Sequence, residues 1–477
     1  MATTRVNFTE WLPDQPGVVG ALTNARNVYP KAVGYGPFPE EENYSGDASE
    51  SLNSVVGAKD SSGATRIFAG GSTKLFLLNA TDLSLSDVSG ATYTSTTKWR
   101  FAQFGNYLIA SNFNEQLQYA DLSTGTISFG PLHASAPTAK LLTVVRDFVV
   151  TGNTSTASNE VRWSGINNPT GTWGSVAVTQ ADFQTIPDGG EIRGLTGGEF
   201  GLVLLERSIV RMSYVGSPLI FQFDNISRNL GCYESNSVAQ WQGITYWLAD
   251  DGFYACNGQQ VEPIGAEKVN RFFWESVKEE LINQMSVAVD SFRSLIVWGY
   301  PSQDNTYRLL VYHTVTKRWS FAETAITYVG DLMTPAFTLE DLDNFSASID
   351  ALDVSLDSRQ WLGGKLLFGG VSGTKIITFT GANKTARITT ADLETDSNMS
   401  MVVLAKPIID GGSASVAIAS RMNLSETPTF GDAVAASSEN RVGLRSLGRY
   451  HRLRVIPSGE WTTAIGTEIE INPAGMR

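Results

Sequence analysis

The sequence has few of the residues that build disulfide frameworks and metal centres. Among its 477 residues are two cysteines, Cys232 and Cys256, and three histidines, His133, His313 and His451. Two thiols exclude a disulfide scaffold and a multi-cysteine metal site. We predict that both cysteines are buried free thiols, because a cytoplasm keeps thiols reduced. The histidines lie too far apart in sequence to indicate a metal triad.

Long apolar runs are also missing. No run reaches the roughly 18 residues of a transmembrane helix, so the sequence predicts no membrane span. The first residues, MATTRVNFTEWLPDQPG, lack the basic and then apolar pattern of a signal peptide. We therefore expect the chain to be made and assembled in a cytoplasm.

Positive charge is scarce as well. The chain carries 35 Lys and Arg against 48 Asp and Glu, which gives a net charge of -13 at pH 7. Proteins that grip nucleic acid supply cations to neutralise phosphates, so this balance argues against such a role. Solubility is the simpler interpretation of the acidic balance. The alternative is a wall past which DNA slides without sticking, and it requires the carboxylates to line a lumen.

Catalytic motifs are absent from the sequence. It contains no G-x-S-x-G turn, no H-E-x-x-H helix and no G-x-x-x-x-G-K-[ST] loop. A glycosidase would need two carboxylates about 5 to 9 Å apart, and Asp250, Asp251 and Asp290 are the candidates for a channel mouth. However, Asp251 is explained by a turn, and the Ser-x-Asp-x-Gly-x-x-Trp hairpins of sialidases are missing. We predict no enzyme activity, no catalytic residues, no cofactor and no metal site.

The composition favours many short strands. Glycine contributes 45 residues, aromatic residues 10% and charged residues 17% of the chain, which suits strands joined by Gly-rich turns. Residues 237–265, SVAQWQGITYWLADDGFYACNGQQVEPIG, read as three short strands joined by two tight turns. Asp251-Gly252 and Asn257-Gly258 predict type I′ turns. This pattern is typical of one blade of a β-propeller.

Similar strand and turn patterns recur along the chain. A chain of 477 residues needs several domains or a repeat architecture. The starts are mostly about 35 to 50 residues apart, as expected for propeller blades. They lie near residues 66, 99, 141, 192, 238, 287 and 361. The sequence therefore predicts an all-β fold, a β-propeller of six or seven blades, with two flat β-sandwiches as the alternative.

One helix and one acidic insert interrupt the strands. Residues 267–285 predict a helix whose apolar stripe is explained by core packing. The stripe consists of Val269, Phe272, Phe273, Val277 and Leu281. Residues 339–357 are acidic and predict an exposed loop or short helix. They lack the Asp-x-Asp-x-Asp-Gly pattern of a calcium loop.

The two ends differ from the middle. Residues 11–40 contain five prolines, which remove backbone donors and fix φ. We predict that residues 1–60 form an extended arm laid over other structure and away from the centre of any sheet. The propeller is expected at 61–385, and the alternating pattern of 386–477 predicts a small antiparallel β domain.

Four arginines cluster in this last domain, against the acidic trend of the chain. One interpretation is that they lie on solvated strand faces and pair with Glu468 and Glu470. The other is that they form a surface for an acidic partner. The four are Arg445, Arg449, Arg452 and Arg454.

Three strings carry a family resemblance. WLPDQPG, followed by ARNVYPKAVGYGPFPE, resembles the start of the tail hub or nozzle proteins of short-tailed bacteriophages, also called packaged DNA stabilisation proteins. Residues 229–265 are similar to the strand-rich middle of that family. Residues 448–477, GRYHRLRVIPSGEWTTAIGTEIEINPAGMR, are similar to its C-terminal strands.

This resemblance implies a structural virion protein of the tail. It implies a homo-hexameric ring below the portal and the head-to-tail adaptor that extends and closes the DNA channel, for genome retention and ejection. The implied partners are also tail fibres or spikes and viral DNA, which would pass through the lumen without specific binding. We expect the arm and the C-terminal domain to make the ring contacts. The alternative is a receptor-binding or glycan-cleaving tail propeller; the Gly-His and Trp-Asp signatures of a WD-repeat scaffold are missing.

Overall fold

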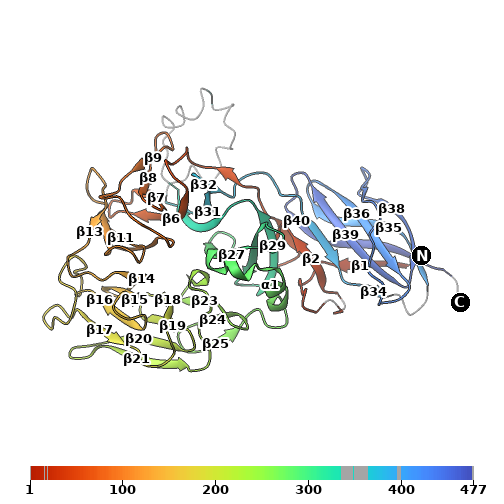
Figure 1. Ribbon diagram of the computed structural model, residues 1–477. Helices are drawn as coiled ribbons and strands as arrows, with labels where there is room; N and C mark the ends of the chain where they lie inside the picture. The colour runs from red at the N-terminus through yellow and green to blue at the C-terminus, as the bar shows by residue number, and fades with distance from the viewer. Residues whose placement is uncertain are drawn as a thin grey trace.

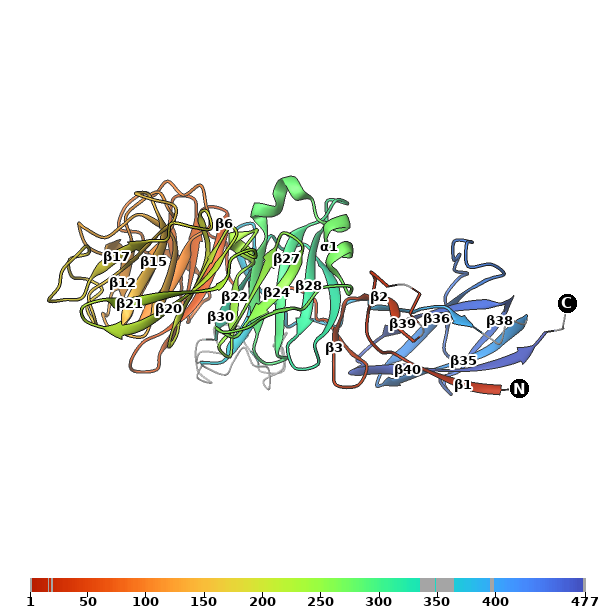
Figure 2. The ribbon, with the colours of Figure 1, turned by 90° about the horizontal axis from the view of Figure 1, so that it is seen from below.

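The computed structural model describes residues 2–15, 17–18, 20–334, 348, 364–394 and 399–474. Most of these residues lie in short strands, which form two bodies side by side: a ring of small sheets and a two-layered β domain (Figure 1). Both ends of the chain lie at the outer end of the β domain (Figure 2). The acidic insert expected at 339–357 lies outside the described residues apart from Ser348.

Five consecutive sheets of the ring share one simple order. Each has four antiparallel strands joined as a meander in chain order. The strands are β6 (Leu52–Lys59), β7 (Thr65–Gly71), β8 (Leu75–Leu78), β9 (Leu85–Asp87), β10 (Arg100–Phe104), β11 (Tyr107–Ser111), β12 (Gln118–Asp121), β13 (Gly130–Pro131), β14 (Ala139–Val145), β15 (Phe148–Thr154), β16 (Glu160–Trp163), β17 (Asp182–Thr185), β18 (Ile192–Thr196), β19 (Gly201–Leu205), β20 (Ile209–Gly216), β21 (Ile220–Ser227), β22 (Ala239–Trp241), β23 (Ile244–Ala249), β24 (Gly252–Cys256) and β25 (Val261–Pro263).

Two further four-stranded units complete the ring. Their strands are β26 (Ser286–Asp290), β27 (Leu295–Pro301), β28 (Tyr307–His313) and β29 (Arg318–Thr324), then β30 (Tyr328–Met333), β31 (Leu366–Ser372), β32 (Lys375–Thr378) and β5 (Glu42–Asn43). The prediction of an all-β, propeller-like fold is therefore confirmed. Two flat sandwiches do not fit this region, because its four-stranded units circle a common centre (Figure 1).

Buried tryptophans link neighbouring sheets of the ring. The Nε1 of Trp99 donates to the carbonyl of Gly71 at 2.8 Å, and that of Trp298 donates to the carbonyl of Ser237 at 2.8 Å. Both indoles are almost fully buried. A buried indole supplies a large apolar area and needs one acceptor for its N–H. Each of these contacts meets both needs at the boundary between two sheets.

The unit at residues 237–265 has four strands, β22 to β25, where the sequence predicts three. The hairpin of β23 and β24 pairs Ala249 with Gly252, so the central turn residues are Asp250 and Asp251, and neither has a positive φ. The type I′ prediction is wrong here because Gly252, with φ +140°, opens the next strand and stands outside the turn. The second loop is also not a two-residue type I′ turn: the Oδ1 of Asn257 accepts the two N–H groups that follow Gly258.

The predicted helix at 267–285 is wrong in extent. The structure has a short helix α1 (Asn270–Ser276) and a 3₁₀-helix η2 (Glu279–Gln284). Between them, Val277 is extended and bridges Ser302, while the N–H of Lys278 donates to the carbonyl of Pro301 at 2.9 Å. Pairing with the end of β27 therefore stops the helix. Of the predicted stripe, Val269, Phe273 and Val277 are buried.

The β domain is a sandwich of two layers. One layer has the order β3-β4-β40-β35-β38, with β1 also paired to β40. The other continues from β29 as β2-β33-β39-β36-β37, with β34 paired to β39. Their bounds are β1 (Ala2–Asn7), β2 (Leu22–Arg26), β3 (Val28–Pro30), β4 (Tyr35–Pro37), β33 (Arg387–Thr390), β34 (Leu393–Glu394), β35 (Ser400–Asp410), β36 (Ser413–Arg421), β37 (Val434–Ala435), β38 (Val442–Gly448), β39 (Tyr450–Ser458) and β40 (Thr463–Pro473).

The prolines of the N-terminal residues predicted that this region stays away from sheet centres. That prediction is wrong. Strand β2 lies inside a ten-stranded sheet, between β29 of the ring and β33 of the β domain (Figure 2). Proline cannot donate to a ladder, but the prolines of this region lie on either side of Leu22–Arg26 and leave its N–H groups free to pair. One continuous sheet thus joins the two bodies.

Asn27 holds this junction together. It is 6% exposed and has a φ of +57°. Its Oδ1 accepts the N–H of Glu323 at 2.9 Å, and its Nδ2 donates to the carbonyl of Thr385 at 2.9 Å. Asparagine tolerates this left-handed conformation better than most residues because its side chain bonds to nearby backbone. The ring and the β domain therefore share one buried amide.

We expect Asn27→Ala to destabilise the protein strongly. It removes two buried hydrogen bonds and leaves their backbone partners unpaired, a loss of about 2–4 kcal/mol in the free energy of unfolding. Chemical denaturation followed by tryptophan fluorescence measures this. The matched control is Asn305→Ala, since Asn305 also has a positive φ but is exposed. Equal losses in the two variants would contradict the role of Asn27.

Candidate functional site in the channel of the sheet ring

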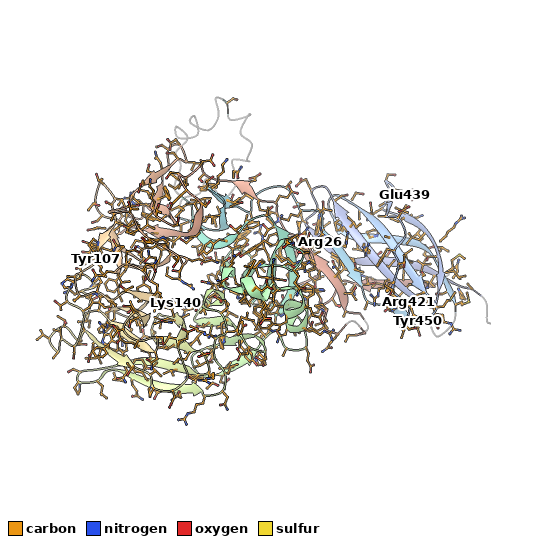
Figure 3. The ribbon with its side chains drawn as sticks, viewed as in Figure 1. Arg26, Tyr107, Lys140, Arg421, Glu439 and Tyr450 are labelled. Atoms are coloured by element: carbon orange, nitrogen blue, oxygen red, sulfur yellow. The ribbon has the colours of Figure 1, made fainter. Side chains whose placement is uncertain are left out.

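The first strands of the ring sheets surround its centre. Contacts run from β6 to β10, from β10 to β14, from β14 to β18, from β22 to β26, from β26 to β30, and from β30 back to β6. Lys140 on β14 points toward the middle of the ring (Figure 3). These strands therefore line a channel. The N-terminal ends of the strands form one end of this channel, and their C-terminal ends form the other.

One mouth of the channel is a wide depression of about 600 Å³. It lies where β10, β14 and β22 end and where the loop after β18 begins. Its polar lining is mostly uncharged: the Nε2 of Gln240 donates to the carbonyl of Gly197 at 2.7 Å. The carboxylate of Glu199 lies 3.7 Å from the Nε of Arg146, and both side chains are exposed. This mouth offers amides and backbone groups but no concentrated charge.

The opposite end of the channel is constricted by two basic side chains. The Nζ of Lys98 donates to the carbonyls of Gln284 and Met285, each at 2.7 Å. The Nη2 of Arg100 donates to the carbonyl of Ser235 at 2.9 Å and to the Oδ1 of Asn236 at 2.8 Å. Lys98 and Arg100 belong to the second sheet, whereas their partners precede the fifth and sixth. The two side chains therefore cross the channel and connect sheets that are not neighbours.

Burial makes Lys98 a poor cation. Burial and, to a smaller extent, the charge of Arg100 lower the pKa of the Lys98 amine to about 7, against the attraction of Glu234. Its ammonium lies over the ring of Tyr328, 5.1 Å from the centroid. Desolvation has the opposite effect on an acid of β30, where it raises the pKa of Asp331 to about 6. The channel thus contains two groups that titrate near neutrality.

Lys98 gives the protein a specific pH dependence. Between pH about 7 and about 10 the unfolded chain binds a proton at Lys98 that the folded chain binds more weakly, so its contribution to stability rises with pH. In Lys98→Met this contribution is absent, and wild type should gain stability over the variant as pH rises across that window. Urea denaturation at several pH values measures the difference. Parallel pH profiles of the two proteins would contradict it, and Lys140→Met is the control.

The carboxylates considered for a glycosidase do not form a pair at either channel cavity. Asp290 is 4% exposed and its Oδ2 accepts from the Nη1 of Arg293 at 2.7 Å. Asp251 accepts the hydroxyl of Tyr254 at 2.6 Å, and Asp250 is exposed in the same turn. The expectation that they reach a channel mouth is wrong for these residues, since none lines either end of the channel. Asp290 lines a cavity of about 520 Å³ near Tyr29 and Trp461 instead.

The histidines and cysteines are structural. His133 and His313 accept N–H groups of their own turns, and His451 lies buried between the hydroxyls of Ser400 and Ser420. Cys232 and Cys256 are buried free thiols, as predicted. Burial raises the pKa of Cys232 to about 12 and also raises that of Cys256, which leaves both unreactive.

The described residues include neither a metal-binding cluster nor a membrane-spanning helix. They contain no group of three or more His, Cys, Asp or Glu side chains placed to hold a metal ion. Within the same residues, none of the helices has the length and apolar character needed to cross a membrane.

Two of the four clustered arginines pair with groups other than the expected glutamates. Arg452 makes two hydrogen bonds to the carboxylate of Asp392, at 3.1 and 2.8 Å, and the guanidinium of Arg454 lies 3.7 Å from the ring centroid of Phe430. The predicted pairing with Glu468 and Glu470 is wrong for these two, because β39 and β40 belong to different layers of the sandwich. Arg421 shares Asp392, next to Tyr450 in the register (Figure 3). Arg445 and Arg449 are exposed.

The sequence analysis missed Lys98 and Arg100. Their signal is the alternation around buried Trp99: its neighbours on both sides must face away from the sheet interface, toward the channel. The sequence of one strand does not indicate which distant carbonyls accept from its side chains. The contacts of Lys98 and Arg100 across the channel were therefore not predictable from the sequence.

Comparisons with known proteins define the class no further than the fold does. No protein-family model and no curated protein matches the chain. A chain of the "Crystal Structure of Mitotic Checkpoint Complex" is similar over 73% of this chain and 93% of that chain, with 11% sequence identity and a TM-score of 0.39. At that level of similarity it carries no argument about function. The protein is a mostly β protein with propeller-like sheets joined to a β domain.

Proposed function

We propose that the protein is a structural virion component, the tail hub or nozzle of a short-tailed bacteriophage. In this proposal six copies form a ring below the portal and adaptor, extend the DNA channel and close it until ejection. The ring of sheets in each copy is a propeller of seven blades, the sixth being β26 to β29 and the seventh being closed by β5. The resemblance in the N-terminal arm suggests this family.

The observation that carries the proposal is the continuous sheet through β2. It makes the propeller and the β domain one body with two distinct ends, and a closed ring needs two different surfaces that repeat around an axis. Enzymes, in contrast, place their reacting groups on loops around a scaffold. The sheet therefore favours a structural role in an assembly.

The residues of the resembling string have structural contacts that support this reading. Trp11 is fully buried and its ring packs against Phe272 and Phe321, at centroid distances of 4.9 and 5.2 Å. The carboxylate of Asp14 accepts the N–H groups of Arg271 and Phe272, each at 2.9 Å. WLPDQPG thus fixes helix α1 to the arm. The contacts described for this string are structural and include no chemical group of an active site.

A receptor-binding or glycan-cleaving tail propeller is the second candidate. The 520 Å³ cavity favours it, because aromatic side chains, Tyr29, Phe292 and Trp461, line it beside the Asp290–Arg293 ion pair. Against cleavage stands the engagement of Asp290 by Arg293 and by backbone N–H groups. A screen for binding and cleavage of host glycans separates the two functions.

Mass measurement and electron microscopy of the purified chain, alone and with its portal and adaptor, test the main proposal. We expect a ring of six copies that attaches to the adaptor. A chain that stays monomeric and never joins a tail would exclude it. The same images report the lumen: an acidic lumen agrees with DNA sliding through it, and a strongly basic one contradicts that account of the net charge.

A further inference from the structure

The constricted end of the channel contains a small cavity of about 60 Å³. Its size leaves room for a few water molecules or one small ion, and not for a nucleotide or a sugar chain. Residues from four different sheets of the ring form its wall. They are Lys98, Trp99, Arg100, Asn236, Val238, Ser286, Val287 and Tyr328.

Both cations of this cavity lack an ion-pair partner. Among the described residues, neither Lys98 nor Arg100 has a carboxylate oxygen within ion-pair distance, and only neutral carbonyl and amide oxygens accept from them. The nearby carboxylates are engaged elsewhere: Glu234 accepts the N–H of Asn236 at 2.9 Å, and Asp331 accepts the N–H of Val289 at 2.7 Å. Two basic side chains therefore share one small space, and both are charged when Lys98 is protonated.

Hydrogen-bond donors remain available in the cavity. The bonds of Arg100 all come from its Nη2, so its Nε and Nη1 carry three N–H groups without an acceptor in the described part of the chain. Lys98 uses two of its three N–H groups. Two other polar side chains of the wall have partners: Asn236 donates to the carbonyl of Asn283, and Ser286 accepts the N–H of Val329. The charged donors that remain come from Lys98 and Arg100.

We propose that this cavity binds a small tetrahedral oxyanion, phosphate or sulfate, between Lys98 and Arg100. An N–H of Nη1 can donate to one oxygen of such an anion, and the ammonium supplies a point charge to a second. The anion neutralises the repulsion between the two cations. It also ties the second sheet to the fifth and sixth through its own bonds. This inference does not depend on oligomeric state and stands apart from the proposed function.

Anion binding should be coupled to proton uptake. An anion next to Lys98 favours its ammonium form and raises a pKa that is about 7 in the empty cavity. At pH about 8 most of the empty sites have a neutral Lys98, so binding takes up a proton, whereas at pH about 6 Lys98 is already charged. Sulfate does not titrate in this range, so the uptake reports the protein alone.

Isothermal titration calorimetry of the full chain with sodium sulfate and, separately, sodium phosphate tests the proposal. The titrations run at constant ionic strength, at both pH values, in two buffers of different ionisation enthalpy. We expect saturable binding of at least one anion, with proton uptake for sulfate at the higher pH only. Absence of saturable binding of both anions would overturn the site. The two anions distinguish a phosphate site from a general oxyanion site.

Variants locate the binding. Lys98→Met and Arg100→Met should each weaken binding about tenfold or more, as expected for loss of a charge-assisted bond. Lys140→Met removes another lysine of the ring interior and should leave the affinity unchanged. If Arg100→Met fails to fold, Arg100→Lys retains the charge, loses the N–H groups of the guanidinium, and should still bind more weakly. Unchanged affinity in both the Lys98 and Arg100 variants would place the anion elsewhere and refute the proposal.

Discussion

The pairing of β2 with strands on both sides is the constraint on which the rest of the structure depends. Through Arg26 this strand meets Phe321 of β29 in parallel, and it runs antiparallel to β33. Figure 3 shows Arg26 at the junction of the two bodies, where its guanidinium lies 2.8 Å from the carboxylate of Glu323. Without β2, the ring and the sandwich would be separate domains joined by a linker. With it, they share a sheet and a core.

The core shows the same continuity. One cluster of buried apolar side chains extends from Trp298 and Trp319 of the ring, past Trp11, to Val455 and Trp461 of the sandwich. Domain interfaces in a single chain are usually smaller and more polar than a domain core. This one is formed by the same kinds of residue as the interior on either side. Relative motion of the two bodies would therefore require core side chains to separate.

Local patterns were sufficient to predict the strands and not their long-range partners. The alternation and turn residues of 237–265 predict strands where β22 to β25 lie, and the low cysteine count predicts the buried thiols. The turn type depended on which two residues occupy the loop, and a register shift of one residue moved Gly252 into a strand. The helix prediction failed because Val277 has a β-sheet partner in Ser302, which no helical periodicity can reveal.

The site was harder to predict than the fold for the same reason. Lys98 and Arg100 matter because of carbonyls about 135 to 190 residues further along the chain, and Arg452 because of Asp392 on an adjacent segment. One interpretation of the sequence paired the arginines with Glu468 and Glu470, which are closer in the chain but lie in the other layer. Charge spacing along a β chain carries little information until the sheet order is known.

The closure of the last ring sheet by β5 has a consequence for biosynthesis. Asn43 pairs with Ile377, Arg26 with Arg387, and Val6 with Thr467, so three early strands wait for partners that are translated much later. During that interval the emerging chain carries unpaired edges that invite wrong pairing. Non-local closure of this kind slows folding. The pairing that closes the folded molecule therefore also makes its nascent form dependent on protection until those later strands have been made.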